Sequence, residues 1–124
     1  MSVNEQGRVG ELWARDYFKA RGVPVFQPDW IASIDGAYVV VEVKNQERFT
    51  PPPFWGHGLP AYQVRDRLAY QAGTGVRALL LIHEPDTDEV FHQWLDVLEG
   101  GEKFYTSGDS PRVVYPLTSF EVAR

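Results

Sequence analysis

Apolar residues recur at spacings of three and four along the first twenty residues, which is the pattern of an amphipathic helix. The stripe consists of Val9, Leu12, Trp13, Tyr17 and Ala20. Gly22 and Pro24 follow it as a stop signal, so we expect a helix over residues 4–21. Gly7 and Gly10 weaken its first turns, which indicates either a frayed start or a place where another group approaches the backbone closely.

A β-hairpin is predicted after this helix. Two apolar runs, residues 30–34 and 37–44, flank Asp35-Gly36, which is a strong short-range signal for a two-residue turn. A short strand is expected just before the hairpin, over residues 23–27. With Asp35-Gly36 at the turn, the numbers of paired residues add up to 71, so that Trp30 faces Val41.

The rest of the chain indicates a long loop, a second helix and further strands. Residues 46–60 are predicted to form a loop, because the consecutive prolines at 51–53 cannot enter a central strand or a helix interior. We expect a helix over 61–72, strands over 76–82 and 89–95, and a short strand over 112–115 in a mixed tail. The order α-β-β-β-α-β-β predicts an α/β (α+β) fold with a mixed β-sheet and flanking helices.

Length and composition fit one globular domain spanning residues 1–124. The chain is 44% apolar and 23% charged, with an expected core over about residues 5–95 and an extension over 96–124. No apolar run approaches the roughly 18 residues of a membrane span, and no signal peptide is evident. The absence of cysteine excludes disulfides and thiolate zinc sites. We therefore expect a cytoplasmic protein of a bacterial, archaeal or phage-infected cell, without a membrane partner.

Charge is unevenly distributed along the chain. The net charge is −5, which by itself argues against nucleic-acid binding. Residues 1–82 carry nine basic and eight acidic residues, whereas residues 83–124 carry three basic and nine acidic residues. If three carboxylates of the first part hold a metal ion, the remainder of that part forms a locally positive face.

The hairpin register brings two carboxylates together. Continuing the pairing by one residue places Asp29 opposite Glu42, with Cβ atoms about 5 Å apart. Two like charges at that distance are destabilising unless a divalent cation lies between them. Lys44 points to the same face as Glu42, because side chains alternate along a strand. The alternate positions are apolar and are expected to form the buried face: Ala37, Val39, Val41 and Val43.

An aspartate, a glutamate and a lysine on one sheet face indicate a specific chemistry. Carboxylates hold Mg²⁺ or Mn²⁺, and the bound ion stabilises charge on a phosphate and lowers the pKa of its water. A lysine beside them can orient that water or offset the developing negative charge. The alternative is an exposed sheet face with a surface ion pair.

At these residues the sequence resembles the PD-(D/E)xK nuclease superfamily. The motif is Pro28-Asp29, followed after twelve residues by Glu42-Val43-Lys44. The segment Gly7-x-x-Gly10-Glu11 is similar to the first helix of the same group. Small single-domain members similar to archaeal-type Holliday junction resolvases are nearest in size and element order. The resemblance covers about residues 5–82 and implies a restriction-endonuclease-like core and Mg²⁺-dependent cleavage of DNA.

The resemblance also implies roles for individual residues. The implied metal ligands are Asp29, Glu42, the Val43 carbonyl and Glu11. The implied catalytic residues are Lys44, which acts on the attacking water, Glu11, and Gln63, which places the water or the phosphate. Some exonuclease relatives carry a tyrosine four residues after the glutamine, and here that position is Arg67, a departure from the exonuclease pattern. The alternative for Gln63 is a solvated residue in the first turn of its helix.

Candidate DNA contacts surround the motif. They are Arg48, Trp55, Tyr62, Arg65 and Arg67, with Lys19 as a further basic candidate. Arginine side chains bind phosphates, and exposed aromatic rings stack on unpaired bases. The alternative for the aromatic residues of loop 49–59 is a hydrophobic lid or a dimer contact. His57, in the same loop, is expected to be an ordinary loop residue rather than a ligand.

These observations lead to one expected function and one alternative. We expect a Mg²⁺-dependent DNA endonuclease that hydrolyses phosphodiester bonds, with Mn²⁺ as a substitute and branched DNA such as a Holliday junction as a substrate. A homodimer is expected, because two strands of a branched substrate need two active sites. The alternative is a non-catalytic nucleic-acid or protein interaction module that retains the nuclease fold, which the acidic net charge favours.

Overall fold

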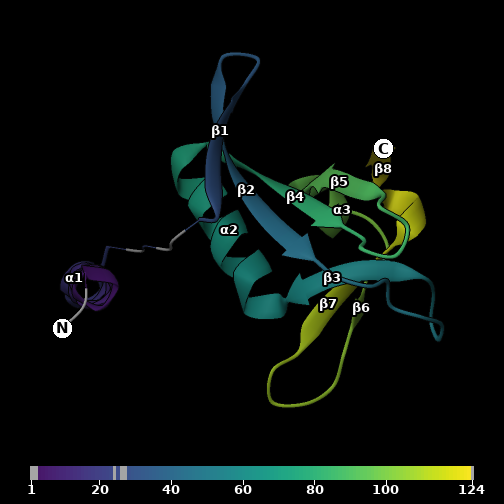
Figure 1. Ribbon diagram of the computed structural model, residues 1–124, viewed down its shortest axis with the longest axis horizontal. Coiled ribbons are helices and arrows are strands. Elements are labelled where there is room, and N and C mark those ends of the chain that lie inside the picture. The colour runs from purple at the N-terminus through teal and green to yellow at the C-terminus, as the bar shows by residue number, and fades with distance from the viewer. Residues whose placement is uncertain (1–2, 24, 26–27, 124) are drawn as a thin grey trace.

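The chain folds into two β-sheets and flanking helices. The computed structural model describes residues 3–23, 25 and 28–123. In that part the elements are, in order, α1 (Val3–Ala20), β1 (Trp30–Ile34), β2 (Ala37–Asn45), β3 (Gly56–Pro60), α2 (Ala61–Thr74), β4 (Arg77–His83), β5 (Val90–Trp94), α3 (Leu95–Glu99), β6 (Phe104–Tyr105), β7 (Arg112–Pro116), the 3₁₀ helix η1 (Leu117–Ser119) and β8 (Glu121–Ala123) (Figure 1).

The larger sheet is mixed and carries the candidate site. Its strand order is β1-β2-β4-β5-β8, and β2 and β4 run parallel while the other neighbours are antiparallel. The smaller sheet has the order β3-β7-β6 and is antiparallel. The crossover from β2 to β4 passes through β3 and α2, which is the long connection that a parallel pair requires. The predicted mixed α+β class is confirmed.

The hairpin forms with the predicted register. The pairs run from Ile34 opposite Ala37 to Trp30 opposite Val41. Asp35 and Gly36 have φ angles of 51° and 82°, so both turn residues are left-handed, as a two-residue hairpin turn of type I′ requires. The Asp-Gly dipeptide tolerates this backbone, which is why the local sequence was sufficient to predict the turn.

Other predicted elements need correction. Most of the expected strand 23–27 lies outside the described residues, and Val23 and Val25 are not in a strand. The third strand is instead β3, inside the segment predicted as a loop over 46–60. It pairs antiparallel with β7, about fifty residues later in the chain, and so its pairing could not be read from local pattern. The short helix α3 begins at Leu95, one residue before the expected tail over 96–124, and its other residues lie within that tail.

The core lies between the larger sheet, α2, α3 and the smaller sheet. Its buried members are Leu59, Val64, Ala78, Leu80, Ile82, Phe91, Leu95, Leu98, Val113, Tyr115 and Phe120. The alternating burial of β4 directs Ala78, Leu80 and Ile82 into this core. Because β4 pairs in register with β2, the same face of β2 carries Glu42, opposite Leu80.

Both faces of the centre of β2 are covered, contrary to the expectation of one buried face and one open face. Val39, Val40, Val41 and Glu42 are all buried. The expected apolar face is buried only at Val39 and Val41, since Ala37 is exposed and Val43 is half-buried. The face with Glu42 is also buried, because α2 lies across it. The candidate chemistry is therefore at the edge of the core rather than on an open sheet face.

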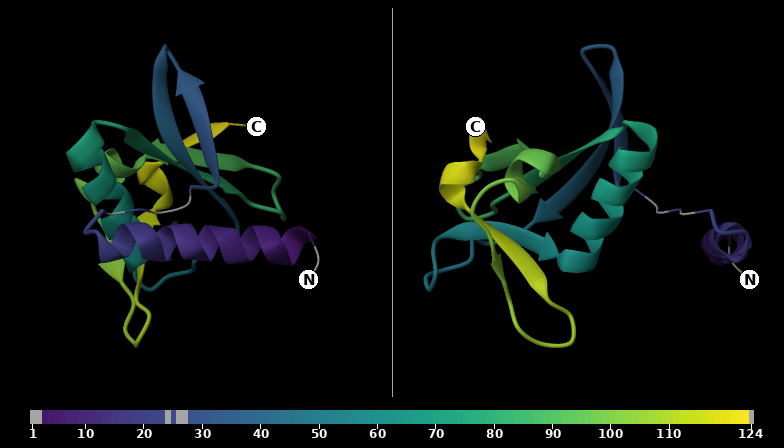
Figure 2. Two further views of the ribbon diagram at one scale, coloured as in Figure 1. Left: turned by 90° about the vertical axis from the view of Figure 1, so that its left-hand side faces the viewer. Right: turned by 180° about the vertical axis from the view of Figure 1, so that it is seen from behind.

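The helix α1 stands apart from the two sheets (Figures 1 and 2). It forms where the apolar spacing predicted, but its stripe is not buried: Trp13 is 66% exposed, Val9 53% and Tyr17 40%. Trp13 stacks on Tyr17 with ring centroids 5.2 Å apart, so the aromatic part of the stripe contacts itself. No helix among the described residues is long and apolar enough to cross a membrane.

Candidate functional site

Two polar contacts join the last part of β2 to the first two turns of α2. Lys44 Nζ donates a hydrogen bond to Gln63 Oε1 at 2.9 Å. Arg67 Nη2 lies 3.2 Å from Glu42 Oε2, and Lys44 Nζ lies 3.5 Å from Glu42 Oε1. Gln63 and Arg67 are four residues apart and so share one helix face, as Glu42 and Lys44 share one strand face. The sequence motif and the start of α2 therefore form one cluster.

Glu42 is the buried centre of this cluster. Its side chain is only 5% exposed, and each carboxylate oxygen has a cationic neighbour. A buried carboxylate is costly unless it is paired, so Lys44 and Arg67 stabilise its charge. Arg67 is buried, whereas Lys44 is about one-fifth exposed and faces the accessible side.

Asp29 contacts β2 through a side-chain hydrogen bond and not through the predicted strand pairing with Glu42. The strand ladder ends at the Trp30–Val41 pair, so Asp29 is not paired with Glu42. Its Oδ2 accepts a hydrogen bond from the Val43 N–H at 2.9 Å. The Asp29 carboxylate is therefore held against the backbone of the residue that follows Glu42, and Asp29 is exposed while Glu42 is buried.

A cleft between α1 and α2 leads to this cluster. Its volume is about 1110 Å³, and Glu11, Gln63 and Arg67 are among its lining residues. Glu11 thus belongs to the same cleft as the β2–α2 cluster, although it comes from the helix that stands apart. Arg8 and Arg15 line the cleft from the same side of α1.

The residues fit a hard metal ion in their chemistry but not in a completed geometry. Asp29, Glu42 and the Val43 carbonyl supply oxygen ligands of the kind that Mg²⁺ prefers. Within the described residues no group of three or more acidic or histidine side chains is close enough to hold a metal ion, so Glu11 does not complete the site. Both oxygens of Glu42 already contact cationic side chains. Binding an ion there requires Glu42 to rearrange its partners.

The predicted DNA contacts do not gather on one surface. Tyr62 is 50% exposed and lines the cleft, and Arg65 is exposed, with Nε 3.9 Å from Asp66 Oδ1. Trp55 is 52% exposed, next to β3. Arg67 contacts Glu42. Arg48 pairs with Glu84 and is not among the residues that line the cleft.

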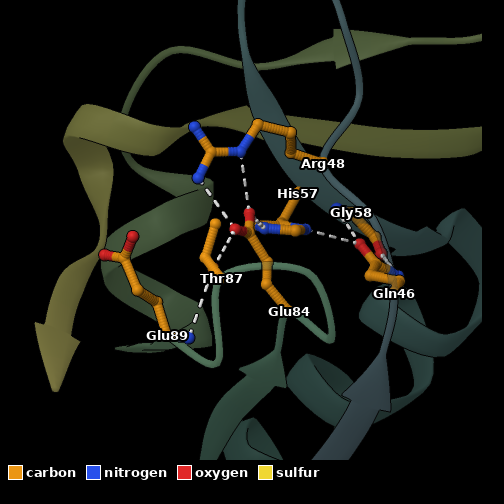
Figure 3. A network of polar contacts seen from close by, with 7 residues as sticks. All are labelled: Gln46, Arg48, His57, Gly58, Glu84, Thr87 and Glu89. Carbon is orange, nitrogen blue, oxygen red and sulfur yellow. Dashed lines mark hydrogen bonds and ion pairs between the residues drawn. The ribbon is translucent and has the colours of Figure 1, made fainter. Parts of the chain in front are cut away.

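A buried polar network joins the ends of β2 and β4 to β3 (Figure 3). Glu84 accepts hydrogen bonds from Arg48 Nε at 3.0 Å and Nη2 at 2.7 Å, and from Thr87 Oγ1 at 2.8 Å. His57 Nε2 lies 2.6 Å from Glu84 Oε2, and His57 Nδ1 lies 3.0 Å from Gln46 Oε1. His57 is fully buried, so the expected loop residue is part of the interior. Sequence reasoning missed this network, because Glu84 is 27 residues from His57 and no local spacing connects them.

Opposing effects set the pKa values in this network. Burial alone raises the pKa of Glu84, but the hydrogen bonds from Arg48, Thr87 and His57 lower it to about 2. Burial lowers the pKa of His57, and the contact with Glu84 only partly offsets that effect. The network is centred on a carboxylate held in its charged form, and it stabilises the junction of the two sheets.

Comparisons with known proteins give a limited result. No protein-family model matches the chain, and no curated protein matches its sequence. Among solved structures, the chain is similar to Archaeoglobus fulgidus Hjc, a Holliday junction resolvase from an archaeal hyperthermophile. The two chains are 16% identical with a TM-score of 0.46, over 86% of this chain and 83% of the other.

Proposed function

We propose that this protein is a Mg²⁺-dependent DNA endonuclease that hydrolyses phosphodiester bonds, with Mn²⁺ as a substitute. The observation that carries the proposal is the cluster at β2: Asp29 Oδ2 accepts the Val43 N–H at 2.9 Å, and the ammonium group of Lys44 lies 3.5 Å from Glu42 Oε1. A sequence motif is weak when its residues are scattered by the fold. Here Gln63 and Arg67, which contact Lys44 and Glu42, line the cleft between α1 and α2.

Each residue has a separate task in this proposal. Asp29, Glu42 and the Val43 carbonyl would hold the metal ion. When bound, the ion would offset negative charge on the phosphate and lower the pKa of a bound water. Lys44 orients the attacking water and offsets negative charge that develops on the phosphate. Gln63 holds Lys44 in place through its 2.9 Å hydrogen bond. Glu11 lines the cleft on the α1 side and is not one of the proposed ligands.

The cleft between α1 and α2 is the proposed path of a DNA strand. Arg8 and Arg15 line it, so phosphates entering the cleft meet guanidinium groups on α1. Tyr62, at the edge of the same cleft, offers an aromatic ring for stacking. Arg65, exposed on α2, provides a further phosphate contact, and Trp55 a further stacking surface. All of these side chains belong to residues 1–82, which carry nine basic and eight acidic residues.

A homodimer is part of the proposal, because a branched DNA such as a Holliday junction has two strands to cut. Of the sixteen exposed large hydrophobic side chains among the described residues, ten lie within residues 9–38, on or beside α1 and the β1–β2 hairpin. The apolar surface that a second copy could cover is therefore concentrated in this part of the chain.

The second candidate is a non-catalytic interaction module with the same fold. It is favoured by the contacts of Glu42, whose two oxygens are already neutralised by Lys44 and Arg67. A site of that kind is stable without any metal ion. The net charge of −5 also fits a partner other than nucleic acid.

One experiment separates the two candidates. Linear duplex, single-stranded, flapped and four-way DNA are incubated with the protein in Mg²⁺, in Mn²⁺ or in EDTA. The nuclease proposal expects internal cuts that require the metal ion, with more product from the branched substrates. Binding without cuts under every metal condition supports the interaction module instead.

A further inference from the structure

We infer that Arg67 is a positioning residue whose contact with Glu42 Oε2 competes with a metal ion for that oxygen, so that metal binding at Oε2 and the Arg67–Glu42 contact exclude each other. The inference rests on the proposed function only in taking Glu42 as a metal ligand. It adds a control element to the site, and it assigns Arg67 a task in addition to the DNA contact expected from the sequence.

The geometry of the contact carries this inference. Arg67 Nη2 lies 3.2 Å from Glu42 Oε2, and the two side chains are 7% and 5% exposed. A buried carboxylate needs a cationic or hydrogen-bonding partner at every stage. Arg67 provides such a partner to Glu42 inside the fold.

The second oxygen of Glu42 separates the roles of the two cationic side chains. Lys44 lies on the Oε1 side at 3.5 Å and is held there by Gln63. Arg67 Nη2 contacts Oε2 instead. An ion that bound through Oε2 would leave the Lys44 contact at Oε1 in place, and Oε2 is the oxygen that Arg67 contacts. Lys44 and Arg67 thus differ in role although both are cations beside Glu42.

The cleft gives Arg67 a second location for its guanidinium group. Arg67 is one of the residues that line the space between α1 and α2, and Arg8 and Arg15 line it from the opposite side. A guanidinium group released from Glu42 would therefore face the proposed path of the DNA backbone. Guanidinium groups bind phosphates as readily as carboxylates, often with two hydrogen bonds. Glu42 would exchange Arg67 for the metal ion, and Arg67 would exchange Glu42 for a phosphate.

The test measures metal binding without DNA and without activity. Mn²⁺ binding is measured by isothermal titration calorimetry on the wild type, Arg67→Gln, Arg67→Lys and Arg65→Gln. Arg67→Gln should bind Mn²⁺ at least about tenfold more tightly, because it removes a positive charge a few ångströms from the ion. Arg67→Lys keeps the charge and should stay near the wild-type affinity. Arg65→Gln removes an exposed charge from the same helix and should also stay near it.

The outcomes distinguish the inference from the proposed function. Equal Mn²⁺ affinity in the wild type and Arg67→Gln would overturn the inference while leaving the metal site in place. Failure of every variant to bind Mn²⁺ would overturn the metal-dependent function itself, and the inference with it.

A measurement on the wild type covers the case in which Arg67→Gln does not fold. The Nε–Hε NMR signal of Arg67 is followed during Mg²⁺ titration, with that of Arg77, which pairs with Asp96, as an internal reference. The Arg67 signal should shift with the same midpoint as the binding curve while the Arg77 signal stays in place. An Arg67 signal that does not move at saturating Mg²⁺ would contradict the inference.

Discussion

Lys44 Nζ and Gln63 Oε1 are joined by a 2.9 Å hydrogen bond that links β2 to the first turn of α2. Because Lys44 is only about one-fifth exposed, this contact determines where its ammonium group points. The same group lies 3.5 Å from Glu42 Oε1. One amide side chain therefore fixes the cation of the sequence motif beside its glutamate.

Gln63→Ala should reduce cleavage without removing it. The substitution frees the Lys44 ammonium group but leaves Asp29 and Glu42 intact. We expect a loss of about tenfold in the single-turnover rate, smaller than the typical effect of removing a transition-state group, and an unchanged Mn²⁺ affinity. Ala69→Ser, at an exposed position of α2, is the control for a substitution in this helix. A Gln63→Ala enzyme as fast as the wild type would show that Lys44 does not need this contact.

Asp29→Asn should abolish Mg²⁺-dependent stabilisation while changing the metal-free protein little. The amide keeps an oxygen that can accept the Val43 N–H, so we expect a change within about 0.5 kcal/mol in EDTA. With excess Mg²⁺ only the wild type gains binding free energy. Asp35→Asn, which removes the same charge at the hairpin turn, should behave like the wild type. Melting temperatures in EDTA and in Mg²⁺ check this, and an equal Mg²⁺ shift for Asp29→Asn would remove Asp29 from the ligand set.

The Glu84 network should make the fold sensitive to acid. The folded-state pKa of Glu84 is about 2, below the 4.5 of an unperturbed glutamate, so its contribution is present above pH 4.5 and is lost as the pH falls toward 2. The size of that contribution is about 3 kcal/mol. His57, whose pKa burial lowers, adds a loss that begins below its unperturbed value of 6.5, because the unfolded chain binds the proton first.

The check is urea unfolding between pH 7 and pH 3. Glu84→Gln should lower the free energy of unfolding at pH 7 by about 3–5 kcal/mol, because Arg48 and His57 lose their charged partner. Its stability should then vary less than that of the wild type below pH 4.5. The exposed Glu102→Gln is the matched control. Parallel pH profiles for the wild type and Glu84→Gln would contradict the assigned role of Glu84.

Gly58→Ala should destabilise the fold by about 3 kcal/mol or more, because its Cβ would lie 2.0 Å from the Val113 carbonyl oxygen of the paired strand β7. Backbone cannot move aside as a flexible side chain can. Gly73→Ala is the opposite case, since nothing lies within 4 Å and the residue is inside α2. We expect a gain of about 0.5–1 kcal/mol there. Chemical denaturation of both variants checks the pair, and equal effects would show that β3 and β7 are not this close.

Some of the fold could be predicted from local sequence and some could not. The hairpin was predictable because Asp35-Gly36 alone determines the turn, and the turn determines the register. The strand β3 was not, because Gly56, His57 and Gly58 have no apolar alternation and are selected by close approach to β7. Local patterns describe an element, whereas strand pairing across fifty residues depends on tertiary packing.

The candidate site shows the same division. Glu42 and Lys44 share a strand face because strands alternate, which the sequence predicted. The Asp29–Val43 contact depends on where the ladder ends, and the Arg67–Glu42 pair depends on how α2 lies across β2. Of these two relationships, the first has no signature in the spacing of residues. The signal that could have suggested the second one is the pair Gln63 and Arg67, four residues apart on one helix face.

The central claim is that Lys44 serves the cleavage of DNA at a metal site made by Asp29 and Glu42. It is tested most directly by single-turnover cleavage with Lys44→Ala, on whichever DNA the wild type cuts best in Mg²⁺, with Mn²⁺ affinity measured on the same preparation. We predict a loss of about 10²–10³-fold in rate, as for other groups that stabilise charge in the transition state, together with retained Mn²⁺ binding and retained folding. Undiminished cutting by Lys44→Ala, or metal-dependent cutting that persists when both Asp29 and Glu42 are neutralised, would contradict it.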